Sequence, residues 1–281
     1  MSESKKFINY YFFILLHLKR FIYLLKKITI FIYFGINWFF KSKEHTSFSF
    51  HLSNELSSSI AYRISKLIDV ELNEVKKLFK FLKSVNVDKP KFSSFLHKTS
   101  DIDFVNKFDY RVIPFSLFYL TEVKHVIELG FNQGRLLFLL NKFHSEFRKF
   151  LQHDKKYIGL DFNPRKGGFL KNVNLILPSE IHFDKVENYF IKNKEMISSI
   201  INDSILICTT HEKNSEDFIF NFLEKNNYFP KFIISDNILE NSSFYKYYKN
   251  NTDKYEYELF TFYNKNIFYN NLEIGVLKYL T

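Results

Sequence analysis

The fold is decided by one stretch of the sequence, Val126-Ile127-Glu128-Leu129-Gly130-Phe131-Asn132-Gln133-Gly134-Arg135-Leu136. An apolar run ends in an acidic residue and a glycine, and an apolar helical pattern begins directly after the second glycine. Gly130 allows a sharp backbone turn, and Gly134 allows a ligand or a strand to approach the helix start closely. The helix start offers unpaired N–H groups and the positive end of the helix dipole. The stretch therefore predicts a strand, a tight turn and a helix.

The spacing of the glycines distinguishes this turn from a dinucleotide-binding fingerprint. The turn reads G-x-x-x-G and lacks the G-x-G-x-x-G spacing, and Glu128 stands two residues before the first glycine. It resembles the first motif of class I S-adenosylmethionine-dependent methyltransferases, an acidic residue followed by x-G-x-G-x-G. Asn132 occupies the place of that family's usual middle glycine, and Asn tolerates a left-handed backbone better than most residues. An ordinary strand-to-helix turn that binds no ligand is the alternative.

Strand and helix patterns alternate from residue 101 onward, as in a sheet with crossover helices. The predicted strands are residues 124–129, 157–161, 174–177, 204–210, 231–235, 255–263 and 272–279. The predicted helices are residues 115–121, 134–151, 184–200, 215–225 and a short stretch from about 242; Pro114 suits the first helical position. Five strand–helix units and a terminal strand pair resemble the seven-stranded methyltransferase sheet, in which the last strand is antiparallel. We expect a Rossmann-like α/β domain over residues 101–281, with helices on both faces of a mostly parallel sheet.

A second acidic residue ends the second predicted strand. Asp161 lies 27 residues after Gly134, and the charged insert at residues 153–156 accounts for the length of this connection. A carboxylate in this place can accept two hydrogen bonds from ribose hydroxyls, and ligands of open α/β sheets bind beyond the carboxyl ends of the strands. The resemblance implies that Asp161 holds the ribose of S-adenosylmethionine.

The resemblance also implies roles for the neighbouring residues. The glycine turn would hold the methionine part of the cofactor, and Phe162 and Ser179 would lie near the adenine. A place in the core is the alternative for Phe162. Apart from the resemblance, Arg111 lies close in sequence to the start of the first strand, so we expect it to reach a carboxylate at the cofactor site; a surface arginine is the alternative. The predicted cofactor-binding residues are Glu128, Gly130, Asn132, Gly134, Asp161, Phe162, Ser179, Thr210 and Arg111.

Methyl transfer is an in-line displacement on an activated cofactor, so positioning supplies much of the rate. An oxygen nucleophile usually also needs a base. His211 follows the fourth predicted strand and titrates near neutral pH, and Glu212 is the second candidate. A solvated loop histidine is the alternative. The nine histidines show no pair at helical metal-ligand spacing, and the single Cys208 in an apolar run reads as a buried, inert thiol, so we expect no metal site.

The net charge of +10 is unevenly distributed along the chain. Residues 1–100 contain 17 Lys/Arg and 7 Asp/Glu, whereas residues 101–281 contain 23 of each kind. A neutral catalytic region argues against a nucleic-acid partner. A basic first third fits an anionic membrane surface. We therefore expect an oxygen acceptor on a small molecule, glycan or lipid-linked molecule that is handled at the membrane.

Residues 7–41 form an aromatic and aliphatic segment, which is interrupted by Lys19-Arg20 and Lys26-Lys27. The basic residues fall on one side of a helical wheel, as in a helix that lies in a membrane interface. The sequence thus predicts a cytoplasmic protein that is peripheral to the membrane. A helix packed on its own domain, a signal anchor and a spanning helix that buries Lys26 and Lys27 remain open.

Residues 42–100 contain a polar linker and two predicted helices, 54–68 and 71–85, which read as a cover attached to the main domain. The expected organisation is therefore 1–41, 42–100 and 101–281. Three rival functions remain: an NAD- or nucleotide-sugar-binding oxidoreductase, a non-catalytic membrane-attached domain, and an RNA or protein methyltransferase.

Overall fold

The computed structural model describes residues 47–48, 54–84, 87–88, 110–131, 134–147, 154–162, 174–210, 213–262 and 272–280. The chain divides into two compact units, Met1–Phe48 with Asn86–Asn106, and Ser49–Val85 with Lys107–Thr281. The described part of the first unit is an antiparallel pair of short strands, β1 (Ser47–Phe48) and β2 (Val87–Asp88). The predictions for residues 7–41 lie outside the described residues.

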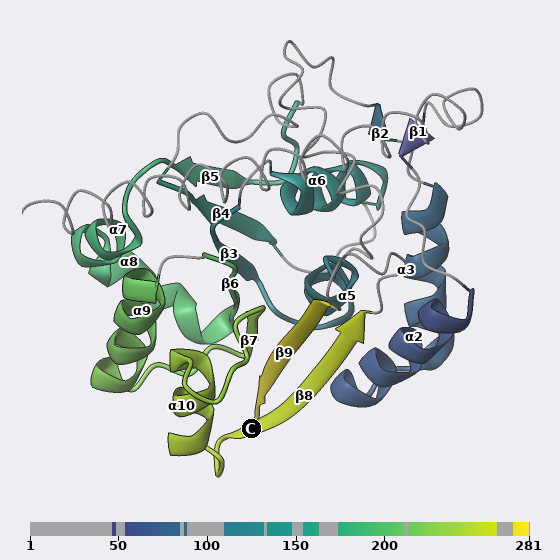
Figure 1. The fold of residues 1–281 in the computed structure, drawn as a ribbon. Coiled ribbons are helices and arrows are strands. Elements are labelled where there is room, and N and C mark those ends of the chain that lie inside the picture. Colours follow the sequence, from purple (N-terminus) through teal and green to yellow (C-terminus); the bar gives the residue numbers. More distant parts are fainter. Residues whose placement is uncertain are drawn as a thin grey trace, which may run out of the picture. The chain divides into compact units, whose positions relative to one another are not determined.

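The second unit is built around a seven-stranded sheet (Figure 1). Its strands are β3 (His125–Leu129), β4 (Lys156–Leu160), β5 (Ser179–His182), β6 (Ser204–Cys208), β7 (Phe232–Ser235), β8 (Tyr255–Phe262) and β9 (Leu272–Tyr279). The order is β5-β4-β3-β6-β7-β9-β8. Strands β3 to β7 pair in parallel, whereas β9 is antiparallel to both β7 and β8. The predicted sheet, mostly parallel with an antiparallel last strand, is confirmed.

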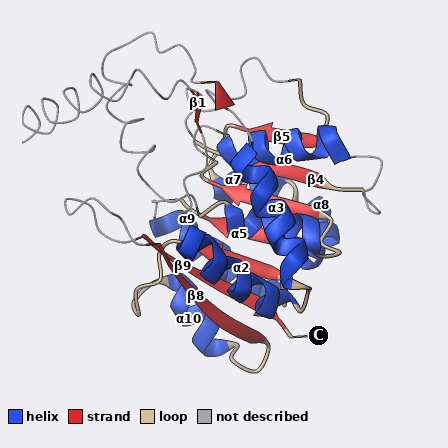
Figure 2. Ribbon diagram, turned by 90° about the vertical axis from the view of Figure 1, so that its right-hand side faces the viewer, coloured by secondary structure: helices blue, strands red, loops and turns tan. Residues whose placement is uncertain are grey.

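Helices cover both faces of this sheet, as predicted. They are α2 (Asn54–Ile68), α3 (Leu72–Ser84), α5 (Val112–Leu120), α6 (Arg135–Phe147), α7 (Val186–Lys192), α8 (Lys194–Ile200), α9 (Lys213–Asn226) and α10 (Ser243–Asn250), with a 3-10 turn at Ile201–Asp203. Figure 1 shows α7 to α10 on the left of the sheet and α5, α2 and α3 on the right. Figure 2, turned by 90°, looks onto the side that carries α2 and α3. No helix in the described ranges is long and apolar enough to cross a membrane.

The core lies between the sheet and these two helix layers. All five residues of β6 are buried, because a parallel strand covered on both faces has no solvated side. On one face, Ile127, Leu206 and Ile233 pack in a cluster with Phe190 and Leu223 of the α7–α10 layer. The neighbouring residues of the strands, Glu128 among them, therefore face the opposite layer, because successive side chains of a strand point to opposite faces.

Helix α5 begins earlier than the sequence predicted. It starts at Val112, so Pro114 lies inside the first turn, where a missing N–H breaks no helical hydrogen bond. The first seven residues of α5 are buried, because the helix lies between the sheet and α2, α3 and α6. Phe115 stacks on Phe81 of α3 at 6.3 Å and meets Phe143 of α6 at 5.4 Å between ring centroids.

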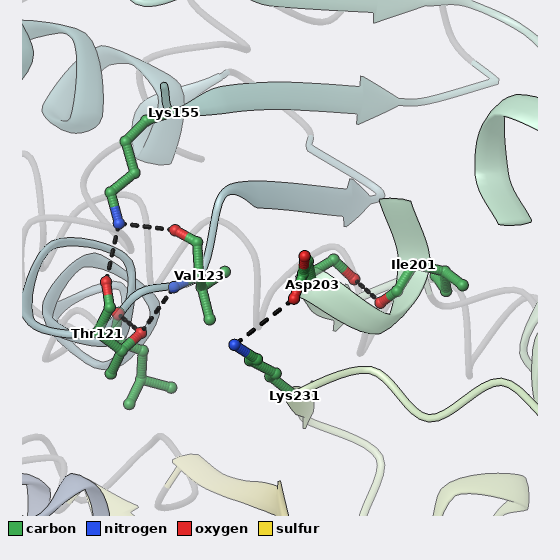
Figure 3. A network of polar contacts seen from close by, with 8 residues as sticks. Thr121, Val123, Lys155, Ile201, Asp203 and Lys231 are labelled. Atoms are coloured by element: carbon green, nitrogen blue, oxygen red, sulfur yellow. Dashed lines mark hydrogen bonds and ion pairs between the residues drawn. The ribbon is translucent and has the colours of Figure 1, made fainter. Parts of the chain in front are cut away.

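A buried lysine closes the carboxyl end of α5. The Lys155 ammonium donates to the carbonyl oxygens of Phe118 at 2.5 Å, Thr121 at 2.9 Å and Val123 at 2.6 Å; Figure 3 shows the last two of these bonds. The carbonyls at a helix end lack helical partners, and Lys155 supplies one donor to each. Burial, followed by the positive charge of Lys231, lowers the pKa of Lys155 to about 8.

Helix α2 of the second unit lies against β8, the edge strand of the sheet. The Arg63 side chain of α2 donates from Nε to a Glu258 carboxylate oxygen at 2.6 Å and from its guanidinium to the Leu259 carbonyl. The same guanidinium lies 4.8 Å from the centroid of the Phe260 ring. Helix α2 also packs against α3, and both helices belong to the same compact unit as the sheet.

The third strand lies further along the chain than predicted. Residues 174–177 are not a strand, because the Asn141 side chain satisfies their backbone: its Oδ1 accepts from Ile176 at 2.6 Å and Leu177 at 3.0 Å, and its Nδ2 donates to the Asn174 carbonyl at 3.0 Å. Strand β5 begins only after Pro178. The predicted edge strand was thus five residues too early.

The predicted helix at residues 184–200 is divided into α7 and α8 at Asn193, which has φ −111° and ψ 29°. The Asn193 side chain donates to the Tyr189 carbonyl at 2.9 Å, so a side-chain bond satisfies the backbone where the helix ends. Ser242 caps α10 by accepting from the Tyr245 N–H at 3.2 Å, which agrees with the predicted helix start.

Candidate functional site

The carboxyl ends of the five parallel strands lie along one edge of the sheet, here named the carboxyl edge. The register pairs Leu129 with Leu160 and Cys208, and Cys208 with Ser235. The residues that follow these strand ends therefore lie side by side. This edge collects Gly130, Asp161, Thr209 and Asp236 from four different connections.

The glycine turn has the conformation that the sequence predicted. Gly130 has φ +82° and Gly134 has φ +75°, a region that L side chains rarely adopt. A Cβ atom at Gly130 would also lie 2.9 Å from the Thr209 carbonyl oxygen, so the turn has no space for a side chain. Gly130 N–H donates to the Leu160 carbonyl at 2.8 Å, and α6 begins directly after Gly134. Asn132 lies outside the described residues.

Two carboxylates are buried beside this turn. Glu128 is 2% exposed at the end of β3, and Asp161 is 3% exposed directly after β4. The Tyr157 hydroxyl donates to Glu128, and the Asp161 backbone N–H donates to the His182 carbonyl at 3.0 Å. Burying a carboxylate costs free energy unless hydrogen bonds or charges compensate, so two buried carboxylates beside one turn make these positions candidates for binding a ligand.

Exposed aromatic side chains follow the ends of β4 and β5, close to Asp161 in the chain or in the sheet. Phe162 is 56% exposed, which excludes the alternative that it belongs to the core. Phe183, directly after β5, is 46% exposed, and its ring centroid lies 5.7 Å from that of the buried Phe131. Sequence reasoning missed Phe183 because it placed the third strand at residues 174–177. The signal was present in the chain, since Phe183 stands one residue after the true strand end.

Ser179 does not join this group. It is the first residue of β5 and pairs in register with Tyr157, near the start of β4, so it lies toward the opposite edge of the sheet. Its hydroxyl donates to the Leu177 carbonyl at 2.7 Å. Its predicted place beyond a strand end depended on the misplaced strand and is corrected here.

The connection after β6 is bonded to the glycine turn. The backbone N–H of Thr209 donates to the Leu129 carbonyl at 3.1 Å, and so does its hydroxyl, also at 3.1 Å. The Thr210 nitrogen would lie 3.1 Å from a Cβ at Gly130, so the predicted residue Thr210 adjoins the turn. His211 and Glu212 lie outside the described residues, and their catalytic roles stay predictions.

Arg111 is buried directly before α5. Its guanidinium lies 5.2 Å from the centroid of the Tyr110 ring, and its charge acts on the Tyr157 hydroxyl that binds Glu128. The structure thus places the Arg111 charge near the hydrogen-bonded pair of Tyr157 and Glu128. Its role toward a ligand stays a prediction.

Sequence reasoning did not identify Glu216, a buried carboxylate of α9. It accepts from the Asn237 side chain at 2.6 Å and from the Phe244 N–H at 3.3 Å, which ties α9 to the β7–α10 connection. Burial raises the pKa of Glu216. Burial also raises the pKa of the Cys208 thiol, followed by the charges of Glu216 and Asp236, so this buried thiol is inert. Within the described ranges, no three His, Cys, Asp or Glu side chains gather as metal ligands.

Comparisons with known proteins give matches only at the level of structure. No protein-family model matches the sequence, and no curated protein matches it. A TDP-rhamnose 3′-O-methyltransferase of calicheamicin biosynthesis matches with 12% identity and a TM-score of 0.39, over 81% of this chain and 96% of that chain. A methyltransferase from Podospora anserina, solved with S-adenosylhomocysteine, matches with 9% identity and a TM-score of 0.38, over 82% and 97%. An rRNA methylase from Streptococcus thermophilus matches with 12% identity and a TM-score of 0.40, over 60% and 93%.

Proposed function

We propose that the protein binds S-adenosylmethionine at the carboxyl edge and transfers its methyl group to an acceptor. One observation carries the proposal: two buried carboxylates, Glu128 and Asp161, end adjacent parallel strands on either side of a positive-φ glycine turn. The strand order, with antiparallel β9 between β7 and β8, agrees with the methyltransferase resemblance of the sequence. The dinucleotide-binding order 3-2-1-4-5-6 has no such inserted strand.

The residues present fit this cofactor. Gly130 leaves the turn without a side chain, so the backbone and the start of α6 can approach a ligand. Asp161 supplies a carboxylate for the two ribose hydroxyls. Phe162 and Phe183 offer exposed aromatic faces for an adenine ring, which replaces the role first given to Ser179. Glu128 offers a negative charge to the ammonium group of the methionine part.

The bound cofactor supplies an activated methyl group on a sulfonium centre, and the protein supplies position and a base. We assign the base role to His211, with Glu212 as the second candidate, because both follow the Thr209 connection that is bonded to the glycine turn. An imidazole that accepts the proton of an acceptor hydroxyl contributes typically about 10²–10⁴ in rate. The acceptor atom in this proposal is oxygen.

The acceptor is a small molecule, a glycan or a lipid-linked molecule at the membrane surface. The charge distribution supports this class, since residues 101–281 contain 23 basic and 23 acidic residues and the excess of positive charge lies in residues 1–100. A long nucleic-acid substrate would favour a basic field around the site. Residues 7–41 are proposed to attach the protein to the cytoplasmic membrane surface through a basic, aromatic helix.

Calorimetric titration tests the cofactor assignment. The purified protein should bind S-adenosylmethionine and S-adenosylhomocysteine and should fail to bind NAD. Incubation of membrane extracts with labelled S-adenosylmethionine should then yield a labelled product. NAD binding without S-adenosylmethionine binding would favour the oxidoreductase. Cofactor binding without any transfer would favour the non-catalytic domain.

Fractionation tests the membrane assignment. The protein should bind anionic vesicles, and high salt should weaken this binding without abolishing it, because salt screens charges and leaves apolar burial intact. Replacement of Lys19, Arg20, Lys26 and Lys27 by Glu should release much of the protein from the vesicles. Resistance of the wild type to alkaline carbonate would instead indicate a spanning helix. Failure to bind vesicles would indicate a helix packed on its own domain.

A further inference from the structure

Tyr157 is a fully buried tyrosine whose hydroxyl donates to the Glu128 carboxylate. The two residues are not opposite each other in the sheet. In the register of β3 and β4, Val126 lies opposite Tyr157, and Glu128 lies opposite Gly159. The tyrosine ring therefore extends along its own strand, by two residues, toward the carboxyl edge.

Gly159 provides the space for this ring. A Cβ atom at Gly159 would lie 2.8 Å from Cε1 of Tyr157 and 3.0 Å from its hydroxyl oxygen, closer than real Cβ atoms normally come. Gly159 has no positive φ, so its backbone conformation does not require a glycine. A glycine is required there because a side chain would occupy the space of the tyrosine ring. The tyrosine and the glycine two residues later are thus a matched pair, because the ring occupies the volume of the missing side chain.

The hydroxyl remains a hydrogen-bond donor. Burial raises the pKa of Tyr157 well above its ordinary value, and the charge and hydrogen bond of Glu128 raise it further, whereas Arg111 acts in the opposite direction. Tyr157 therefore keeps its proton and donates to one carboxylate oxygen of Glu128. A carboxylate held by such a charge-assisted bond has a fixed orientation.

We propose that Tyr157 is a positioning residue that orients the Glu128 carboxylate for the ammonium group of S-adenosylmethionine. The inference rests on the proposed function, in which Glu128 faces the methionine part of the cofactor. Tyr157 acts through Glu128 and touches no substrate. It therefore contributes to the recognition of the amino-acid part of the cofactor and not to that of the adenosine part.

Tyr157→Phe in the full-length chain tests this inference, because it removes the hydroxyl and keeps the ring above Gly159. Three ligands are titrated: S-adenosylmethionine, S-adenosylhomocysteine and 5′-methylthioadenosine, which has the adenosine and the sulfur but lacks the amino-acid part. The variant should bind the first two about tenfold more weakly, the factor that the loss of one charge-assisted hydrogen bond supports. Its affinity for 5′-methylthioadenosine should stay at the wild-type value.

Tyr189→Phe is the matched control. Its hydroxyl is also buried, and among the described residues it has no hydrogen-bond partner, so its removal should change none of the three affinities. Glu128→Gln adds a second readout: in that background, Tyr157→Phe should cause little further loss of S-adenosylmethionine affinity, since the charge that Tyr157 orients is gone.

The outcomes separate this inference from the proposed function. A wild type that binds none of the three ligands refutes the proposed function, and this inference with it. If the wild type and Tyr157→Phe bind S-adenosylmethionine with equal affinity, the inference about Tyr157 is refuted and the proposed function stands. An equal loss of all three ligands in Tyr157→Phe also refutes it, because a general disturbance of the site would have that signature.

Discussion

The carboxyl edge and the opposite edge, where the parallel strands begin and which we name the amino edge, use their charged groups differently. At the amino edge, the Lys155 ammonium donates to three backbone carbonyls, and Asp203 forms an ion pair with Lys231 at 3.5 Å, so charged groups join elements of the protein to one another. At the carboxyl edge, two buried carboxylates stand beside a turn without side chains and beside exposed aromatic rings. We infer that the amino edge serves stability and the carboxyl edge serves a ligand. Changes at the two edges should therefore separate stability from binding.

The largest expected effect is on the rate of methyl transfer and concerns His211, which follows Thr209 and Thr210 in the chain. His211→Ala should lower the rate of methyl transfer by about 10²–10⁴, the usual cost of losing a general base. Cofactor affinity should be retained, because the base acts on the acceptor. The measurement is the initial rate of label transfer from S-adenosylmethionine into membrane extracts, beside a calorimetric dissociation constant. If Glu212→Gln loses the rate and His211→Ala does not, the base is Glu212.

Lys155→Met should cause the largest loss of stability without a loss of binding. The change leaves the three carbonyl oxygens of Phe118, Thr121 and Val123 without their buried donor, and each such loss costs about 1–3 kcal/mol. We expect the free energy of unfolding to fall by about 3 kcal/mol or more in urea titrations. The dissociation constant for S-adenosylmethionine should not change in the folded variant.

Lys77→Met is the control for this change. Lys77 forms an exposed ion pair with Glu74 on α3, and such pairs contribute little to stability. Its urea midpoint should match that of the wild type. A Lys155→Met variant with wild-type stability, or with weakened cofactor binding, would contradict the division of labour between the two edges.

Asp161→Ala should produce the reverse pattern. The loss of hydrogen bonds from two ribose hydroxyls to a carboxylate should weaken S-adenosylmethionine binding at least tenfold, since each bond to a charged group contributes roughly 1.5–3 kcal/mol. Asp203→Ala removes a carboxylate at the amino edge and is the matched control. It should leave the dissociation constant unchanged. If Asp161→Ala and Asp203→Ala bind S-adenosylmethionine with equal affinity, Asp161 does not contact the cofactor.

The sequence predicted the parts of the molecule that local patterns determine. Gly130, Glu128 and Asp161 were identified because an apolar strand, its acidic end and a glycine turn are adjacent in the chain. The mostly parallel sheet was expected from the alternation of strands and helices, and its antiparallel last strand from the resemblance to the methyltransferase sheet. These features depend on residues within one strand–helix unit, so a single sequence contains the information.

The sequence failed where a distant side chain decides the local structure. The Asn141 side chain of α6 satisfies the backbone of residues 174–177, although it lies 33 positions before Asn174 in the chain. The strand therefore begins later than predicted, and the roles assigned to Ser179 and Phe183 change with it. Lys155 was read as part of a charged loop, because its three carbonyl acceptors come from α5 and the residues after it. The pairing of Tyr157 with Glu128 likewise appears only once the register of two strands is known.

The smallest expected effect concerns the titration of Lys155. Burial and the charge of Lys231 lower its pKa from 10.5 to about 8 in the folded protein. Between these two values the unfolded chain holds more protons than the folded protein, so the contribution of Lys155 to stability rises with pH through that window. Below pH 8 both states are protonated, and the cost of burying the ammonium is fully present. Between about pH 7 and about pH 9 the expected gain is about 1 kcal/mol.

This gain must be measured as a difference between two proteins. Burial raises the pKa of the Cys208 thiol above its ordinary value of 9.0, so this group destabilises the fold as pH approaches that value and acts against Lys155. Urea unfolding of wild type and Lys155→Met at each pH cancels this contribution, because both proteins contain Cys208. The stability difference between them should widen by about 1 kcal/mol across the range. A constant difference would mean that the three carbonyl acceptors keep the ammonium protonated, and that the amino edge holds a permanent charge rather than a titrating one.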